Sequence, residues 1–217
     1  MQLHHLTQSS SILDNYMAEL RDVNIQGRRD VFRENIERIG AIVGYEISKT
    51  LTSTKIDINT PLAPHTQRKV DEQIVVITIL RAGLPMHQGI LSVFPHAENG
   101  FVSAYRKHDD DGSFKIEVGY VACPTLQDKT VILNDPMLAT GGSFESAIAA
   151  LEPYGRPKSL HLASVIASRQ GVDYLLGLNL QGHLWVVDID PELNTHKYIV
   201  PGLGDAGDLA FGVKLQS

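Results

Sequence analysis

Residues 131–143, with the sequence VILNDPMLATGGS, have types and spacing that suit the binding of a phosphate group. An apolar run leads into Asp135, and after a short turn two adjacent glycines and the hydroxyls of Thr140 and Ser143 open a helical segment. Glycine lets the backbone approach a ligand closely, and the first turn of a helix offers unpaired N–H groups and the positive end of the helix dipole. We therefore predict a phosphate cradle here, with Asp135 placed to accept hydrogen bonds from sugar hydroxyls. On spacing alone, an ordinary turn acid and helix cap remain an alternative.

The elements that must position this segment follow from the pattern of apolar residues. Residues 74–80 (IVVITIL) form a continuous β-branched run, which is typical of a strand buried on both faces. Further strands are predicted at residues 101–105, 130–133, 160–167 and 184–189, and helices at residues 13–21, 28–51, 86–94, 143–151 and 171–178. Strands that alternate with helices predict a single α/β domain over residues 1–217, with a mostly parallel twisted sheet and helices on both faces. Ligands of such sheets bind beyond the carboxyl ends of the strands, which here means the loops after residues 80, 133 and 200.

A projecting β-hairpin arm is predicted at residues 106–124. Every second residue from 114 to 120 is apolar, which is the period of a half-exposed strand, and the preceding HDDDGS is typical of a hairpin tip.

The composition narrows the class of protein. A formal net charge of −6 disfavours DNA or RNA as partner. The single cysteine, Cys123, cannot form an internal disulfide, and we expect it to be buried in a strand. The N-terminus lacks a signal-peptide pattern, and no apolar run approaches the roughly 20 residues that span a membrane, so we expect a cytoplasmic protein. His4 and His5 are expected to be disordered, and the spacing of the histidines suggests no metal cluster.

Three blocks of the sequence resemble one family. The segment DPMLATGGS (residues 135–143) resembles the phosphoribosyl pyrophosphate (PRPP) loop of type I phosphoribosyltransferases, in the form of the uracil phosphoribosyltransferases, where Asp135 is followed by Pro136. ILRAGLPM (residues 79–86) resembles the pyrophosphate-binding loop of that branch, and YIVPGLGDAGD (residues 198–208) resembles its uracil-binding loop. With the pair Tyr105-Arg106 and a weaker similarity at residues 44–49, the resemblance covers most of the chain in the family's order.

The resemblance implies the salvage reaction in which uracil and PRPP give UMP and diphosphate. It places catalytic roles on Asp135, Arg81 and Asp205. It assigns PRPP binding to Arg81, Arg106, Asp135, Pro136, Met137, Leu138, Ala139, Thr140, Gly141, Gly142, Ser143 and Asp205. It assigns uracil binding to Ile199, Gly204, Asp205 and Ala206, within a loop at residues 198–209. It also implies Mg²⁺ bound mainly through PRPP rather than by protein ligands, and a homodimer or higher homo-oligomer.

The chemistry of these residues agrees with such roles. Guanidinium groups such as those of Arg81 and Arg106 suit the oxygens of a departing pyrophosphate. A loop rich in glycine and proline can hold backbone N–H and C=O groups against the two carbonyls and the N–H of uracil, and would leave groups unpaired against cytosine. From the resemblance we also expect a cis peptide bond at Leu80-Arg81.

Some residues depart from the family pattern. Leu209 stands where the family usually has Arg or Lys, and Arg169-Gln170 stands where Pro-Glu is expected. These departures favour one alternative, a non-catalytic regulator of the same superfamily that senses nucleotides. A second alternative is a phosphoribosyltransferase for another base, which the PGLGDAGD loop disfavours.

Overall fold

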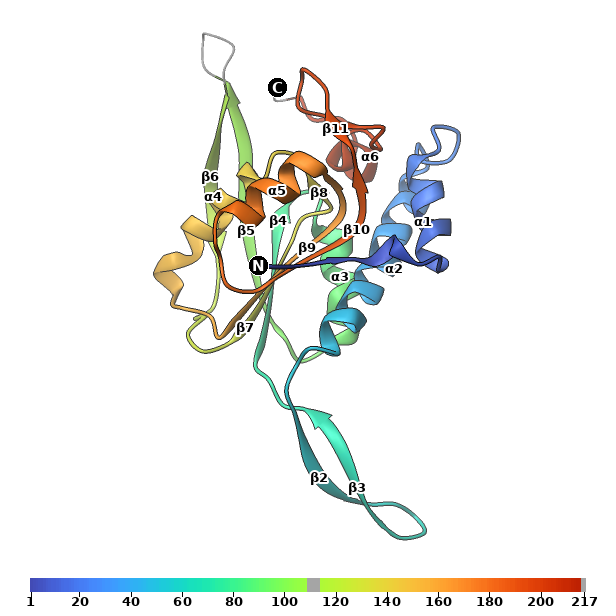
Figure 1. The fold of residues 1–217 in the computed structure, drawn as a ribbon, viewed down its shortest axis with the longest axis vertical. Coiled ribbons are helices and arrows are strands. Elements are labelled where there is room, and N and C mark those ends of the chain that lie inside the picture. The colour runs from blue at the N-terminus through green and yellow to red at the C-terminus, as the bar shows by residue number, and fades with distance from the viewer. Residues whose placement is uncertain (109–113, 216–217) are drawn as a thin grey trace.

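The computed structural model describes residues 1–108 and 114–215, with side chains for all of these except residues 104–108 and 114–117. Its centre is an eight-stranded sheet in the order β1-β10-β9-β7-β4-β5-β6, with the short β8 beside β9 (Figure 1). The strands are β1 (Gln2–His5), β4 (Ile74–Leu80), β5 (Glu98–His108), β6 (Phe114–Ala122), β7 (Thr130–Asn134), β8 (Met137–Leu138), β9 (Ser159–Ser168) and β10 (His183–Asp190). Neighbouring strands are parallel except for β5 and β6. The predicted fold class is confirmed.

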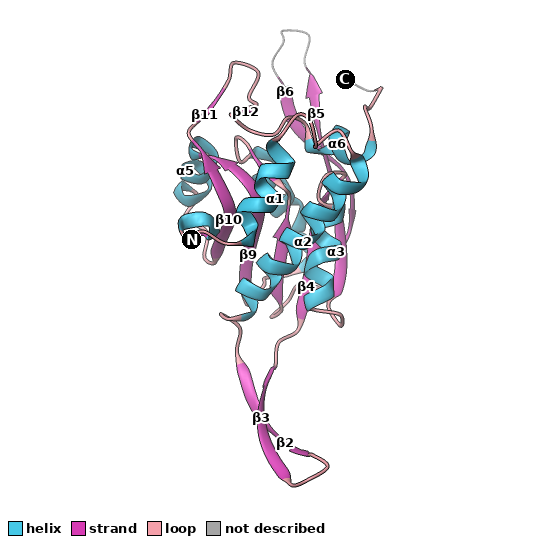
Figure 2. Cartoon of the chain, turned by 90° about the vertical axis from the view of Figure 1, so that its right-hand side faces the viewer, coloured by secondary structure: helices cyan, strands magenta, loops and turns pink. Residues whose placement is uncertain are grey.

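Helices cover both faces of this sheet (Figures 1 and 2). They are α1 (Ile12–Arg21), α2 (Arg29–Ser48), α3 (Leu84–Val93), α4 (Gly142–Leu151), α5 (Arg169–Gly177) and α6 (Ala206–Phe211), with 3-10 turns η1 (Leu6–Gln8) and η2 (Glu152–Tyr154). Successive residues of a strand point to opposite faces. Val76 of β4 therefore packs in the core under α1, α2, α3 and α6, whereas Val75 and Ile77 pack in the core under α4 and α5. No helix in the described ranges has the length and hydrophobicity needed to cross a membrane.

Two expectations about single residues were wrong. His4 and His5 belong to β1, which pairs with β10 from Gln2 to His5, and the His4 ring stacks on Trp185 with centroids 3.8 Å apart. Backbone pairing and ring stacking order this segment, and neither can be read from its own composition. Cys123 is half-buried and follows β6 instead of lying within a strand, because β6 ends at Ala122.

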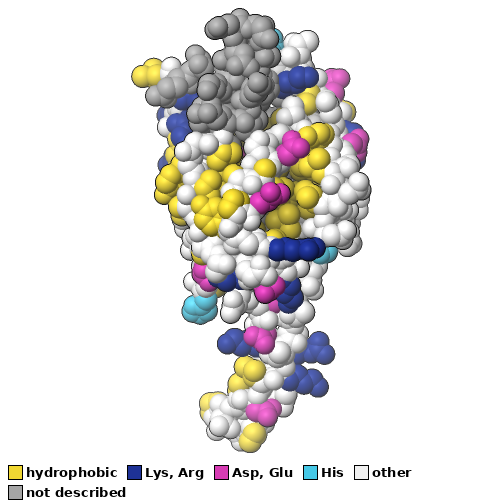
Figure 3. Space-filling model, turned by 90° about the vertical axis from the view of Figure 1, so that its left-hand side faces the viewer, with side chains coloured by type: hydrophobic (Ala, Val, Ile, Leu, Met, Phe, Trp, Pro, Cys, Tyr) yellow, Lys and Arg dark blue, Asp and Glu magenta, His cyan; other side chains and the backbone are white. Residues whose placement is uncertain are grey.

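Two hairpins extend from the molecule. The one predicted at residues 106–124 is formed by β5 and β6. Phe101 pairs with Ala122 at one end of this ladder and His108 with Phe114 at the other, and residues 109–113 lie outside the described residues. The second, β2 (Ser53–Asn59) with β3 (Pro64–Val70), was not predicted, although Ile56 and Ile58 alternate with polar residues. Figures 1 and 3 show it projecting from the body, and Figure 3 shows cationic, acidic and hydrophobic side chains along its surface.

Helices α2 and α3 approach each other so closely that glycine is required between them. A Cβ atom added at Gly89 in α3 would collide with the carbonyl oxygen of Glu37 in α2 and lie 2.7 Å from the amide nitrogen of Ala41. Gly40 in α2 faces the backbone of Met86 in the same way. Because α3 begins three residues after Arg81, this contact also positions the predicted pyrophosphate loop.

We predict that Gly89→Ala lowers the free energy of unfolding by about 1–3 kcal/mol or more, because backbone atoms cannot move aside as a side chain can. Gly177→Ala, at the end of α5, is the matched control, since a Cβ atom added there would have no other atom within 4 Å. It should be neutral or stabilising by up to about 1 kcal/mol. Urea unfolding followed by circular dichroism measures both values, and equal midpoints for the two variants would contradict this account of the packing.

Candidate active site

The carboxyl ends of β4 and β7 lie side by side and are joined by a buried hydrogen bond. The Oγ1 of Thr78 donates to Oδ1 of Asn134 at 3.0 Å, and Nδ2 of Asn134 donates to the carbonyl oxygen of Ile77 at 2.9 Å. Both polar side chains are fully buried. Two of the predicted ligand loops, those after residues 80 and 133, therefore start from one rigid point.

The predicted phosphate cradle leaves β7 and turns into α4. Gly141 has φ +90° and is the N-cap of α4, so the helix begins with a residue that has no side chain to occupy its first-turn amides. The amide of Gly142 donates to Oγ1 of Thr140 at 3.4 Å, and Ser143 lies in the first turn. Ser143 is thus not the helix cap, and the geometry of an anion site at a helix N-terminus is present.

Asp135 lies at the start of this cradle and is almost fully buried. Its Oδ1 accepts a hydrogen bond from the amide of Met137 at 3.1 Å. Burial raises the pKa of Asp135 to about 7, and the carboxylate of Asp205 adds to the increase, whereas the Met137 amide opposes it. Asp135 therefore changes its charge near neutral pH, which is typical of a functional carboxyl group.

Helix α5 supports the cradle from behind. Ser168 caps α5 by accepting from the amide of Gly171, and its hydroxyl donates to the carbonyl oxygen of Ala139 at 2.6 Å. A Cβ at Gly141 would lie 2.6 Å from the ring of Tyr174, so this position also requires glycine for space. The unusual residues Arg169 and Gln170 are exposed in the first turn of α5, beside this support.

The predicted pyrophosphate loop has the expected cis peptide bond at Leu80-Arg81. Arg81 is exposed, and its Nη2 donates to Oδ1 of Asp208 at 3.2 Å and to the carbonyl oxygen of Gly212 at 3.5 Å. The structure thus brings Arg81 against the segment that was predicted to bind uracil. The backbone of Arg106 belongs to β5, and its side chain lies outside the described residues.

The predicted uracil loop follows β12 (Ile199–Val200), which pairs with β11 (Glu192–Leu193). The bond between Val200 and Pro201 is cis, and Gly202 and Gly204 have positive φ values of +66° and +95°. Ile199 and Ala206 are buried in the core, so only their backbone groups could meet a base. The loop therefore offers a ligand main-chain donors and acceptors.

Two acids of this loop and a lysine that follows it form an ionic group. Asp205 was among the predicted site residues, whereas Asp208 and Lys214 were not. Nζ of Lys214 lies 3.1 Å from Oδ2 of Asp205 and 4.0 Å from Oδ1 of Asp208. Burial acts to raise the pKa of Asp205, but the Asp208 amide and the Lys214 ammonium outweigh it, and the pKa lies below its ordinary value. Asp205 therefore loses its proton at a lower pH than Asp135 does. No sequence motif indicates that Asp208 and Lys214 meet, because only the folded backbone brings these two residues together.

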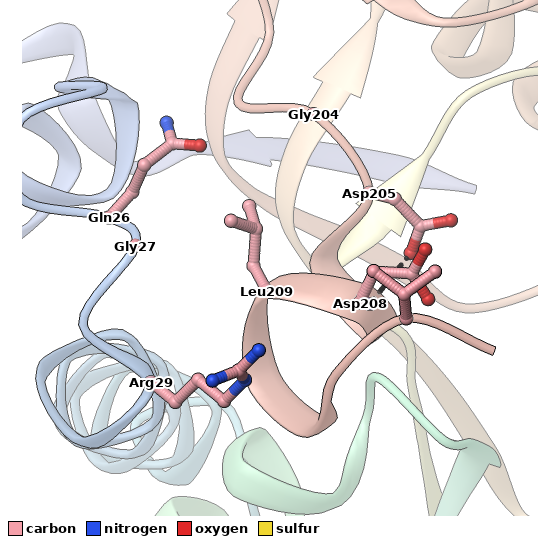
Figure 4. Close-up of a pocket in the computed structure, with 8 residues that line it drawn as sticks. Gln26, Gly27, Arg29, Gly204, Asp205, Asp208 and Leu209 are labelled. Carbon is pink, nitrogen blue, oxygen red and sulfur yellow. Dashed lines mark hydrogen bonds between the residues drawn. The ribbon is translucent and has the colours of Figure 1, made fainter.

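A cavity of about 310 Å³ borders the same loop (Figure 4). It is lined by Gln26, Gly27, Arg29, Gly204, Asp205, Asp208, Leu209 and Val213. Figure 4 shows Leu209 pointing from α6 toward the connection between α1 and α2. The residue that departs from the family pattern thus contributes an apolar wall where a cation was expected.

Together these loops place a helix N-terminus, a buried carboxyl group of raised pKa and a guanidinium around the ends of β4 and β7. Such a set can hold a phosphorylated sugar and stabilise a phosphate leaving group. Of the predicted residues, Arg81, Asp205 and the cradle are brought to the same edge of the sheet.

Comparison with known proteins identifies the family. The model of the family described as uracil phosphoribosyltransferase matches residues 7–213. A uracil phosphoribosyltransferase of Porphyromonas gingivalis is 49% identical over 216 residues, which cover 99% of this chain and 100% of that protein. One of Thermococcus gammatolerans is 38% identical and covers 97% and 93% of the two chains.

Solved structures have the same fold. A protein of Aquifex aeolicus has a TM-score of 0.87 at 28% identity and covers 99% of this chain and 100% of its own. A hypoxanthine phosphoribosyltransferase of Staphylococcus aureus, with a TM-score of 0.51 at 14% identity and coverage of 86% and 84%, shares the fold alone. Since the family model and the relatives match almost from end to end, this chain belongs to the uracil phosphoribosyltransferase family.

Proposed function

We propose that this protein transfers the ribose 5-phosphate group of PRPP to uracil and releases UMP and diphosphate. Membership of the family supports the reaction. The observation that carries the assignment to these residues is the convergence of Asp135, the α4 N-terminus and Arg81 at the ends of β4 and β7.

Each part of the site has a chemical role in this proposal. The first-turn amides of α4 hold the 5′-phosphate, and Asp135 accepts hydrogen bonds from the ribose hydroxyls. Arg81, together with Arg106, neutralises the leaving pyrophosphate. N1 of uracil forms a bond to C1 of the ribose as the bond from C1 to the pyrophosphate oxygen breaks, and the N1 proton is released to solvent. The backbone of residues 199–206 holds the uracil ring.

Magnesium is proposed to arrive with PRPP. A divalent cation bound with PRPP would offset the charge of the leaving group, and Mg²⁺ typically uses few protein ligands and several waters. Asp135 is the carboxylate placed to meet such an ion, whereas Asp205 and Asp208 are paired with Lys214 and Arg81. Within the described ranges no three His, Cys, Asp or Glu side chains converge as ligands.

The direct test is UMP formation from uracil and PRPP with magnesium, beside cytosine, hypoxanthine and orotate. Turnover with uracil alone supports the proposal. Binding of PRPP without turnover of any base would instead support the non-catalytic regulator, for which Leu209, Arg169 and Gln170 are the motivating departures. Turnover with another base would move the assignment to a different phosphoribosyltransferase.

We also propose the cytoplasm as the compartment, because the chain has a single cysteine and no pair for a disulfide, so nothing points to an oxidising compartment. The net charge of −6 continues to disfavour a nucleic-acid partner.

We predict that kcat/KM for PRPP depends on the ionisation of Asp135. The protonated carboxyl group dominates below a pKa of about 7 and is the weaker hydrogen-bond acceptor. The kcat/KM of the wild type divided by that of Asp135→Asn should therefore rise about tenfold from pH 6 to pH 8. At pH 8 the variant should be slower by about 10- to 100-fold, the effect of losing charge-assisted hydrogen bonds. Asp128→Asn, an exposed acid away from the site, is the matched control and should behave as wild type. A ratio that does not change with pH would exclude this role for Asp135.

We also propose that the protein is a homo-oligomer in which the β2–β3 hairpin packs on a second copy. All residues of the hairpin are exposed in one chain, including Ile56, Ile58 and Leu62, and isolated two-stranded hairpins are marginally stable in water. The hairpin has three Lys or Arg residues and one acid, whereas the whole chain has a net charge of −6. A second copy therefore offers both an apolar cover and opposite charge.

The double variant Ile56→Asp/Ile58→Asp should shift the protein to monomers, because it places two buried charges in the proposed contact. Light scattering coupled to size exclusion measures the mass. Val23→Asp, an exposed apolar residue between α1 and α2, is the control and should leave the mass unchanged. A monomeric wild type, or an unchanged mass of the double variant, would refute the proposal.

A further inference from the structure

An ionic cluster at the end of β10 holds the start of the predicted uracil loop. Arg21 is the last residue of α1, and its guanidinium contacts two acids of β10. Its two terminal nitrogens bind both carboxylate oxygens of Asp190, at 2.9 and 2.7 Å, and Nη2 also binds Oδ2 of Asp188 at 2.8 Å. A bidentate pair of this kind fixes the orientation of both side chains.

The same cluster satisfies both backbone groups of Gly202. The amide of Gly202 donates to Oδ2 of Asp190 at 2.7 Å, and its carbonyl oxygen accepts from Nη1 of Arg21 at 3.0 Å. Gly202 is buried and has φ +66°, so the peptide planes on both sides of it are set by these two contacts. Two residues later the chain reaches Gly204, the first loop residue that lines the cavity beside Asp205.

Burial strengthens this arrangement. The Asp190 side chain is 6% exposed and that of Arg21 is 22% exposed, whereas Asp188 is 32% exposed. Burial acts to lower the pKa of Arg21, but its hydrogen bonds to the two acids outweigh this effect and raise the pKa, so the guanidinium stays charged. A charge that is buried and paired in this way is costly to leave without its partner.

We propose that Arg21 and Asp190 are positioning residues for base recognition, which set the path of residues 202–206 and thereby the affinity for uracil. The inference rests on the proposed role of this loop in binding uracil. Neither residue needs to touch the substrate, since each acts through the backbone of Gly202. The fold supplies the contact from three distant parts of the chain, α1, β10 and the loop.

Asp188 provides a matched control for Asp190. Both acids are in β10 and bind Arg21, but only Asp190 binds the loop. Asp190→Asn should raise KM for uracil by about 10- to 100-fold, with kcat changed by less than about threefold, because the lost interaction affects bound uracil and transition state equally. Asp188→Asn should leave the KM for uracil within about twofold. A general loss of stability would not raise the KM for uracil in Asp190→Asn alone.

Arg21→Lys is the second variant. Lysine keeps the positive charge, but its single ammonium cannot make a bidentate contact with Asp190 and also donate to Gly202. Its KM for uracil should also rise, so that a failure of Asp190→Asn to fold leaves the proposal testable. Equal uracil KM values for Asp190→Asn, Asp188→Asn and wild type would overturn the proposal.

Gly204→Ala distinguishes uracil binding by the loop from positioning of the loop by Arg21 and Asp190. Its Cβ would have space, with Leu209 at 3.7 Å as the nearest atom, but φ +95° strains any residue other than glycine. If this variant raises the uracil KM and Asp190→Asn does not, the loop binds uracil and the positioning role is wrong. If neither variant changes it, the loop is not the uracil site, and both proposals fall.

Discussion

The hydrogen bond between Thr78 and Asn134 joins the two strands on which the whole site depends. In a parallel sheet the carboxyl ends of adjacent strands meet at one edge, and here β4 and β7 are neighbours in the centre of the sheet. A polar pair in a core is costly unless its groups are satisfied, and Asn134 meets this condition by also donating to Ile77. The loops that begin at Arg81 and Asp135 therefore keep a constant separation.

Charge is distributed unevenly around this rigid point. Asp135 is buried beside another acid and has a raised pKa, whereas Asp205 and Asp208 are held by Lys214 and Arg81. These ion pairs connect the C-terminal segment to the loop after β4. Arg81, the group suited to a phosphate leaving group, thus has an internal anionic partner in this structure, and a substrate anion must compete with Asp208 for it.

Glycine residues allow the elements to come as close as the site requires. Gly40 and Gly89 let α3 lie against α2, and Gly141 leaves room for Tyr174 behind the cradle. At Gly202 and Gly204 the reason is the backbone conformation, since both have positive φ values. The same residue type therefore serves close packing in one part of the fold and a special turn in another.

The sequence by itself determined the family and most strands and helices of the α/β body, because hydrophobic periodicity and contiguous motifs are local properties of the chain. It predicted a helix at residues 28–51, and the structure has α2 there, with Phe32, Ile36 and Ile39 buried. It missed β1, which depends on pairing with the distant strand β10 and on stacking of His4 against Trp185. It also missed the β2–β3 hairpin, whose residues are all exposed and so show no buried face. Only the tertiary structure decided that Arg21 meets Asp190 and Gly202, and that Lys214 meets Asp205, because such contacts join residues whose separation in sequence follows no period.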